Sequence, residues 1–375
     1  MVACGQSIAA VLPEDRADIL YHRYEGGGVT IDGPSVLVRK QFGGKVSLWA
    51  NYYVDMVSSA SIDVVTSASS DGYTEERTET STGFDYLYDR TTMSFSYTSS
   101  EESDYSAATF GFALSQDFFG DMTTLSMNYS QGNDEVRENI YQNGSVISSD
   151  FRGDASRQRF GVGLTQVLSK NWIMSFNLES VVDEGFLRNP YRTVRFANGD
   201  DIGRAPERYP STRNSDAAAL RSMYYLPYRA ALRTELRAFA DSWGVSSRNI
   251  EFRYLQPYKE GMTFELKLRY YNQSQANFYS DLFPFEDAQT FLARDKELSD
   301  FNSLNLGFGA SYQFPQHWLP IFEKTSAHLF YDRIRFEYGN FRDISGTNTA
   351  TFGLGNEPLY RFDANVIRLF ISAWF

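Results

Sequence analysis

Apolar and polar residues alternate strictly along much of this chain, most clearly over residues 303–314. Every second position there is apolar, in the series Leu304, Leu306, Phe308, Ala310, Tyr312 and Phe314. The positions between them hold only glycine and uncharged polar residues. A period of two is that of a β-strand, because successive side chains point to opposite faces, and helical spacing cannot produce it. The pattern predicts strands with one apolar and one polar face.

The same alternation recurs between clusters of Gly, Pro, Asn, Asp and Ser, and it predicts sixteen strands. They span residues 17–25, 34–42, 45–57, 78–88, 92–100, 105–116, 121–131, 154–168, 171–182, 214–227, 229–241, 246–257, 261–273, 301–314, 325–340 and 361–375. A bulge or a break is expected at the glycines 26–28.

The predicted links alternate in length. Those after most even-numbered strands are short, and long loops follow most odd-numbered strands, at 58–77, 132–153, 183–213, 274–300 and 341–360. A long turn at 315–324 and a short link near Trp243 are exceptions. Short turns at one end and long loops at the other are typical of an outer-membrane barrel.

Composition agrees with a transmembrane β-barrel. Aromatic residues make up 16% of the chain, yet the mean hydropathy is −0.40 and no apolar stretch is long enough for a membrane helix. The predicted fold is an all-β, antiparallel transmembrane barrel of about sixteen strands over residues 17–375, with both termini in the periplasm. Residues 1–16 are expected to be a remnant of a secretion signal or a short periplasmic segment.

Charge and cysteine content narrow the function classes. A net charge of −12 argues against nucleic acid as a partner, because a phosphate backbone needs a basic face. Cys4 is the single cysteine, so no intramolecular disulfide can form. The start of the chain is interpreted as the tail of a secretion signal, as a lipidated Cys4 or as an unstructured native start.

The last residues form an alternating strand that ends on Phe375. One face holds Ile367, Leu369, Ile371 and Phe375, while Arg368 lies on the other. This segment resembles the closing strand of bacterial outer-membrane barrels. The resemblance implies an outer-membrane location among lipid and lipopolysaccharide, and recognition of Phe375 by the barrel-assembly machinery.

Charged residues on the polar strand faces are the candidate lumen-lining set. If the apolar faces meet lipid, the lumen receives Arg221, Arg233, Glu235, Arg237, Glu251, Arg253, Glu265, Lys267, Arg269, Arg333, Arg335, Glu337 and Arg368. Most come from the last seven predicted strands, so one wall would carry dense charge of both signs. These residues could filter solutes as charged pore linings do, or could pair across the sheet as a structural ladder.

The loop at 183–213 is unusually rich in arginine for an acidic chain. It contains Arg188, Arg192, Arg195, Arg204, Arg208 and Arg213 beside Asp200 and Asp201. It could fold inward and constrict the lumen, bind a partner outside, or be a solvated extracellular loop.

No residue set predicts catalysis, a cofactor or a metal. His22, His317 and His328 are too scattered for a metal site, and neither His22 nor His328 has an evident serine partner. The glycines at 26–28 are not a phosphate loop, because no Lys-Ser/Thr and no helix follows them. We therefore expect a protein that is not an enzyme.

Three stretches carry a further resemblance, namely Leu12–Gly28, Asn51–Val64 and Ser115–Asp121. They resemble an uncharacterised family of proteobacterial outer-membrane proteins, known as a domain of unknown function. Members of such families often sit beside small lipoproteins, thioredoxin-like proteins and flavin transferases, and the resemblance therefore implies an envelope redox or export system. The resemblance supports the barrel but supplies no functional residue.

The sequence thus predicts a porin-like channel for small polar or ionic solutes. The alternative is a scaffold or export component that docks a periplasmic lipoprotein or redox partner. An enzyme at the outer rim is a third possibility. The pattern leaves open the solute, the openness of the lumen and the oligomeric state.

Overall fold

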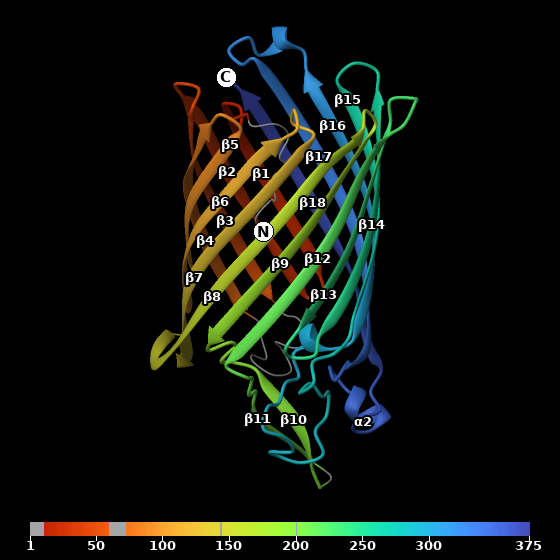
Figure 1. The fold of residues 1–375 in the computed structure, drawn as a ribbon. Helices are drawn as coiled ribbons and strands as arrows, with labels where there is room; N and C mark the ends of the chain where they lie inside the picture. Colours follow the sequence, from red (N-terminus) through yellow and green to blue (C-terminus); the bar gives the residue numbers. More distant parts are fainter. Residues whose placement is uncertain (1–10, 60–72, 143–144, 200) are drawn as a thin grey trace.

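Sixteen strands close into an antiparallel barrel in the computed structural model, which describes residues 11–59, 73–142, 145–199 and 201–375 (Figure 1). The predicted all-β, antiparallel barrel of about sixteen strands is confirmed. The barrel strands are β1 (Arg16–Gly26), β2 (Val29–Phe42), β3 (Val46–Ser59), β4 (Tyr73–Tyr88), β5 (Thr91–Glu101), β6 (Tyr105–Phe118), β7 (Thr123–Gln142), β8 (Ser145–Ser169), β9 (Trp172–Gly185), β12 (Thr212–Tyr225), β13 (Ala231–Asp241), β14 (Ser246–Tyr258), β15 (Met262–Gln273), β16 (Phe301–Phe314), β17 (Lys324–Arg342) and β18 (Leu359–Trp374).

Outside the barrel wall, the described residues form a hairpin and three short helices. The hairpin pairs β10 (Thr193–Asn198) with β11 (Asp201–Pro206). The helices are η1 (Lys296–Leu298), η2 (Gln316–Trp318) and α2 (Asn348–Phe352). None of the described helices is long and apolar enough to cross a membrane.

The first and last strands pair with each other and leave no free edge. Arg16 of β1 lies opposite Trp374 of β18. The start of the first barrel strand and the end of the last one therefore lie at the same rim. The links 43–45, 89–90, 119–122, 170–171, 226–230, 259–261 and 315–323 lie at the same end, here called the short-turn rim (Figure 1, upper end). The opposite end is called the long-loop rim.

Several predicted boundaries are wrong at the long-loop rim. β2 begins at Val29 rather than near residue 34, because Gly27 and Gly28 make a tight turn with φ of +60° and +80°. The loop predicted at 132–153 is instead a continuation of β7 and β8 as a long hairpin. Cys4 lies outside the described residues.

The two faces of the wall differ in chemistry. The outer face exposes large apolar side chains all round the barrel, including Ile19, Leu48, Phe110, Leu178, Leu266, Leu306 and Leu329. Such an apolar belt is expected where a barrel meets lipid. On the inner face, polar groups two strands apart reach each other, as His22 of β1 and Asp55 of β3 do at 2.8 Å between Nε2 and Oδ1. Contacts of this kind identify the concave side.

Three long links pack together at the long-loop rim and are here called the loop cap: residues 186–211, 274–300 and 343–358. One cluster of its core joins Val194 and Phe196 of β10 to Phe283 and Leu292. The second cluster comprises Trp243, Val245, Ala276, Phe278, Tyr279, Ala293, Leu298, Tyr338 and Phe341. The loop cap therefore has a buried core, part of which it shares with the wall through Trp243, Val245, Tyr338 and Phe341.

Candidate functional site

The strand register places most of the candidate lumen-lining residues on the inner face. In β12–β15, the cross-strand pairs put them on the face opposite the exposed leucines 220, 236 and 266. This inner set comprises Arg221, Arg233, Glu235, Arg237, Glu251, Arg253, Glu265, Lys267 and Arg269, and Arg368 of β18 joins it beside Phe330.

Arg333, Arg335 and Glu337 do not point into the lumen, so that prediction is wrong. They share a face of β17 with Leu329 and Tyr331, which are exposed on the outer wall. The inner face of β17 holds Asp332 instead, next to Ile334 and Phe336. The two faces exchange polarity along this strand, because its inner face near the long-loop rim packs on the loop cap through Phe336, Tyr338 and Phe341. The prediction assumed that the charged face of β17 points into the lumen, and so it assigned the two faces of this part of the strand the wrong way round.

Ion pairs link many of the inner residues. Arg221 Nε lies 2.6 Å from Glu235 Oε2, and Arg253 contacts both Glu251 at 2.5 Å and Glu265 at 3.2 Å. Asp332 receives Lys267 and Arg368, the latter with 2.8 Å between Nη2 and Oδ2. Gly307 makes room for the Lys267 contact, since a Cβ there would lie 2.4 Å from Asp332 Oδ1. The ladder interpretation therefore holds for these pairs.

Two inner arginines lack a carboxylate among the described residues. Arg269 donates its Nε to the Asn249 amide oxygen at 2.6 Å. Arg233 lies opposite Arg253 in the register, and its shielded Nε has no hydrogen-bond partner in the described part of the chain. Like charges that face each other across two strands destabilise the pairing, so this position is not explained by the ladder.

The lumen beside β8, β12 and β13 is not filled with side chains. Arg157, Arg221 and Arg237 point inward, yet their side chains are 54%, 41% and 47% exposed. A barrel packed with its own side chains would bury these groups. Water can therefore reach the inner face at these positions.

The charges on the inner face are separated between two walls. On β12–β18 the basic side chains outnumber the acidic ones, with Arg213, Arg221, Arg233, Arg237, Arg253, Lys267, Arg269, Lys324 and Arg368 against Glu235, Asp241, Glu251, Glu265 and Asp332. On β1–β7 the balance reverses, with Arg16, Arg39 and Arg77 against Asp18, Asp55, Glu75, Glu79, Asp85, Asp117 and Asp134. Two opposed walls of unlike sign produce a field across the lumen.

Most arginines of loop 183–213 form ion pairs or hydrogen bonds within the loop cap. Arg192 pairs with Asp295, Arg208 pairs with Asp287 at 2.6 Å, and Arg188 donates to the Glu207 carbonyl. Arg195 is buried against Asp281 and Glu357, and the exposed Arg204 faces it across the hairpin. The β10–β11 hairpin projects beyond the rim, away from the lumen (Figure 1). Binding of an external partner by this loop stays a prediction.

A different segment packs over the lumen. Ala276, Phe278, Tyr279, Ala293 and Leu298, all in 274–300, belong to a buried cluster against which inner-face aromatic residues of the wall pack. Those wall residues are Phe239 of β13, Phe301 of β16, Phe336 of β17 and Phe362 of β18. Residues 274–300 therefore narrow the long-loop end of the barrel on the β13–β18 side. Sequence reasoning missed this segment, because residues 274–300 carry no regular alternation.

Glu207 sits at the centre of the loop cap and is only 1% exposed. Its carboxylate accepts hydrogen bonds from the Tyr209 hydroxyl and the Arg294 backbone N–H, both at 2.7 Å. Burial raises the pKa of Glu207 to about 7, and the nearby Asp295 carboxylate adds to the rise. The loop cap thus contains a carboxyl group that titrates near neutral pH.

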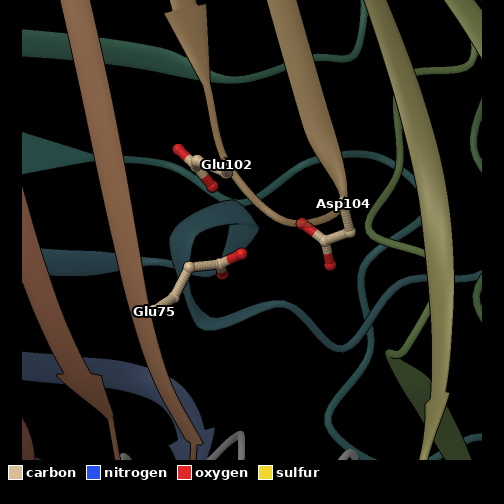
Figure 2. Close-up of side chains that lie close together, drawn as sticks. All are labelled: Glu75, Glu102 and Asp104. Carbon is tan, nitrogen blue, oxygen red and sulfur yellow. The ribbon is translucent and has the colours of Figure 1, made fainter. Parts of the chain in front are cut away.

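Three carboxylates gather at the long-loop rim where β4, β5 and β6 meet. Glu75, Glu102 and Asp104 offer oxygens that lie within 4.8 Å of one another (Figure 2). Burial, and then the Glu75 charge, raise the pKa of Glu102. Ser103 Oγ donates to Glu75 at 2.6 Å, and the Tyr191 hydroxyl donates to Asp104 at 2.6 Å. Oxygen ligands of this kind suit Ca²⁺ or Mg²⁺, but hydrogen bonds already take part of their capacity.

The histidines do not come together. His22 contacts Asp55 and the Tyr53 hydroxyl. The prediction that His328 has no serine partner is wrong, because its ring nitrogens lie 2.7 and 2.8 Å from the hydroxyls of Ser326 and Ser311. Its ring stacks on Phe370 with 4.3 Å between centroids. Both ring nitrogens are thus engaged by hydroxyls rather than by a carboxylate.

Solved structures resemble this barrel in fold. A bacterial polysaccharide outer membrane secretin matches with a TM-score of 0.51 and 7% identity, over 97% of this chain and 99% of that one. The siderophore receptor PirA from Pseudomonas aeruginosa gives a TM-score of 0.45 and 11% identity over 88% of this chain, which spans 60% of the receptor chain. A Pseudomonas aeruginosa FadL homologue gives 0.44 and 9%, over 98% and 91% of the two chains. At these identities the likeness shows the fold alone.

Comparison of the sequence with curated proteins finds no match. The family model described as "Protein of unknown function (DUF3570)" matches residues 62–321, which is more than half of the chain. The resemblance to an uncharacterised barrel family is confirmed. The chain belongs to the DUF3570 family.

Proposed function

We propose that this protein is a bacterial outer-membrane channel that passes small polar or ionic solutes. The closed wall leaves no unpaired strand edge, and its apolar outer belt suits a bilayer. The observation that carries the proposal is the solvent exposure of inner arginines such as Arg157 and Arg237, at 54% and 47%. In a scaffold barrel whose lumen is filled by side chains, we would expect these arginines to be buried.

The charge separation between the two walls favours solutes that carry both signs or a dipole. A field across the lumen orients such a solute and lets each end contact the wall of opposite sign. Residues 274–300 narrow one end, so we expect small solutes to pass more readily than large ones. The channel needs no enzyme activity, in keeping with the expectation that the protein has none.

Swelling of proteoliposomes tests this proposal. Vesicles that contain the refolded protein should swell in an isotonic solution of a small zwitterion such as glycine. Swelling should be slower with a trisaccharide, because of the narrowed end. Equal and negligible swelling with every solute, by vesicles whose barrel is folded, would contradict the proposal.

A second candidate is docking of a periplasmic partner at the short-turn rim. The β16–β17 link is longer than the other turns there, and it exposes Trp318, Leu319 and Ile321, the last at 86%. Exposed apolar groups on a loop favour a protein or membrane contact. Photo-crosslinking from position 321 in cells tests this role. Crosslinks to a periplasmic lipoprotein would support it, whereas crosslinks to lipid alone would contradict it.

A further inference from the structure

Arg233 lies in a row of three cations on the inner wall. Its register partner on β14 is Arg253, and the register partner of Arg253 on β15 is Lys267. The three side chains therefore stand on one face of adjacent strands. A row of like charges in direct register is unfavourable unless something of opposite sign offsets it.

The carboxylates near this row pair with cations other than Arg233. Glu235 pairs with Arg221 at 2.6 Å, and Glu251 and Glu265 both pair with Arg253. Asp332 receives Lys267 and Arg368. Arg233 alone among the three cations of the row has no acidic partner in the described part of the chain, and its Nε is shielded without an acceptor. A buried guanidinium N–H that lacks an acceptor carries a desolvation cost.

We propose that Arg233, with Arg253 beside it, binds a small oxyanion in the lumen. The inference rests on the proposed channel, since it assigns one binding position within that lumen. A guanidinium presents a fixed fork of donors that matches the paired oxygens of a carboxylate or a phosphate. The Arg253 and Arg221 side chains beside the site are 33% and 41% exposed, so an anion can arrive through the lumen.

Calorimetry and conductance on the same refolded full-length protein test the site. In detergent, inorganic phosphate and acetate are titrated separately, and the wild type should bind at least one of them. Arg233→Gln should weaken that binding about tenfold or more, the loss of one charged contact. Arg335→Gln is the matched control, because Arg335 lies on the outer face and should leave binding unchanged.

In a planar bilayer, the anion that binds should block chloride current through the wild type and block Arg233→Gln only at much higher concentration. Wild-type protein that binds neither anion would overturn the site, as would equal affinity in Arg233→Gln. A barrel that binds the anion yet never conducts would support the site and contradict the channel. A barrel that conducts but binds neither anion would support the channel and contradict the site.

Discussion

Arg195 and Glu357 lie 162 residues apart in the chain and form a buried ion pair, with 2.7 Å between Nη1 and Oε1. The pair joins the β10–β11 hairpin to the loop that precedes β18. Asp281 binds the same arginine, and Arg294 binds Asp281 at 3.0 Å. One charge network therefore connects the three segments of the loop cap.

Loss of the Glu357 charge should loosen the loop cap but not the barrel. Glu357→Gln leaves a buried arginine short of one partner, and breaking a buried pair costs about 3–5 kcal/mol. We expect protease cleavage within 274–300 or 186–211, while the folded barrel keeps its heat-modifiable mobility on gels. Asp287→Asn is the control, because its pair with Arg208 is exposed and worth little. Equal protease resistance of both variants would argue against the network.

The loop cap should be more stable at pH 5 than at pH 8. The folded pKa of Glu207, about 7, exceeds its ordinary value of 4.5, so the folded cap holds the proton that the opened cap releases. The stabilisation is present below pH 4.5 and is lost as the pH rises through 7, by at most about 3 kcal/mol. Hydrogen exchange of residues 207–211 and 292–295 measures this. Glu207→Gln should remove the pH dependence of the exchange rates. A pH dependence that persists in this variant would have to come from another titrating group.

Charge reversal on the inner wall should change ion selectivity. Arg233→Glu, Arg237→Glu and Arg269→Glu together should shift the reversal potential in a KCl gradient toward cations, because these side chains border the lumen. Arg335→Glu on the outer face should leave the potential unchanged. Unchanged selectivity in a folded, conducting triple variant would remove these arginines from the conducting path.

Gly33 of β2 should tolerate no side chain. A Cβ there would lie 1.9 Å from the Val54 carbonyl oxygen, and a backbone atom cannot yield without breaking the β2–β3 pairing. Gly33→Ala should lower the fraction of heat-modifiable, folded barrel after refolding. Gly111→Ala is the control, since its Cβ would meet the Ser96 hydroxyl, which can rotate away. A Gly33→Ala barrel that refolds as well as the control would contradict the packing.

The barrel was predictable because alternation is a local signal. Each strand had to place one apolar face toward lipid, so residues such as Leu304 to Phe314 revealed strand and face together. In β17 the same rule failed, since the inner face near the long-loop rim meets the loop cap rather than water. Arg333 and Arg335 then looked like lumen residues, although they lie beyond the apolar part of the outer face with Asp363 between them.

The loop cap could not be predicted because its contacts join distant segments. Arg195 and Glu357 share no pattern along the chain, and the alternation that marks strands is absent from 274–300. The carboxylate Glu75 likewise comes from a different stretch of the chain than Glu102 and Asp104, and no sequence pattern links them. Closure of the barrel and packing of its rim bring these groups together, and neither is encoded in a short window of sequence.

Single-channel recording of the refolded protein in a planar lipid bilayer tests the central claim most directly. The account predicts stepwise currents from a folded, heat-modifiable barrel, with a selectivity that depends on the arginines at 233, 237 and 269. A folded barrel that stays electrically silent at every voltage and salt concentration would contradict it.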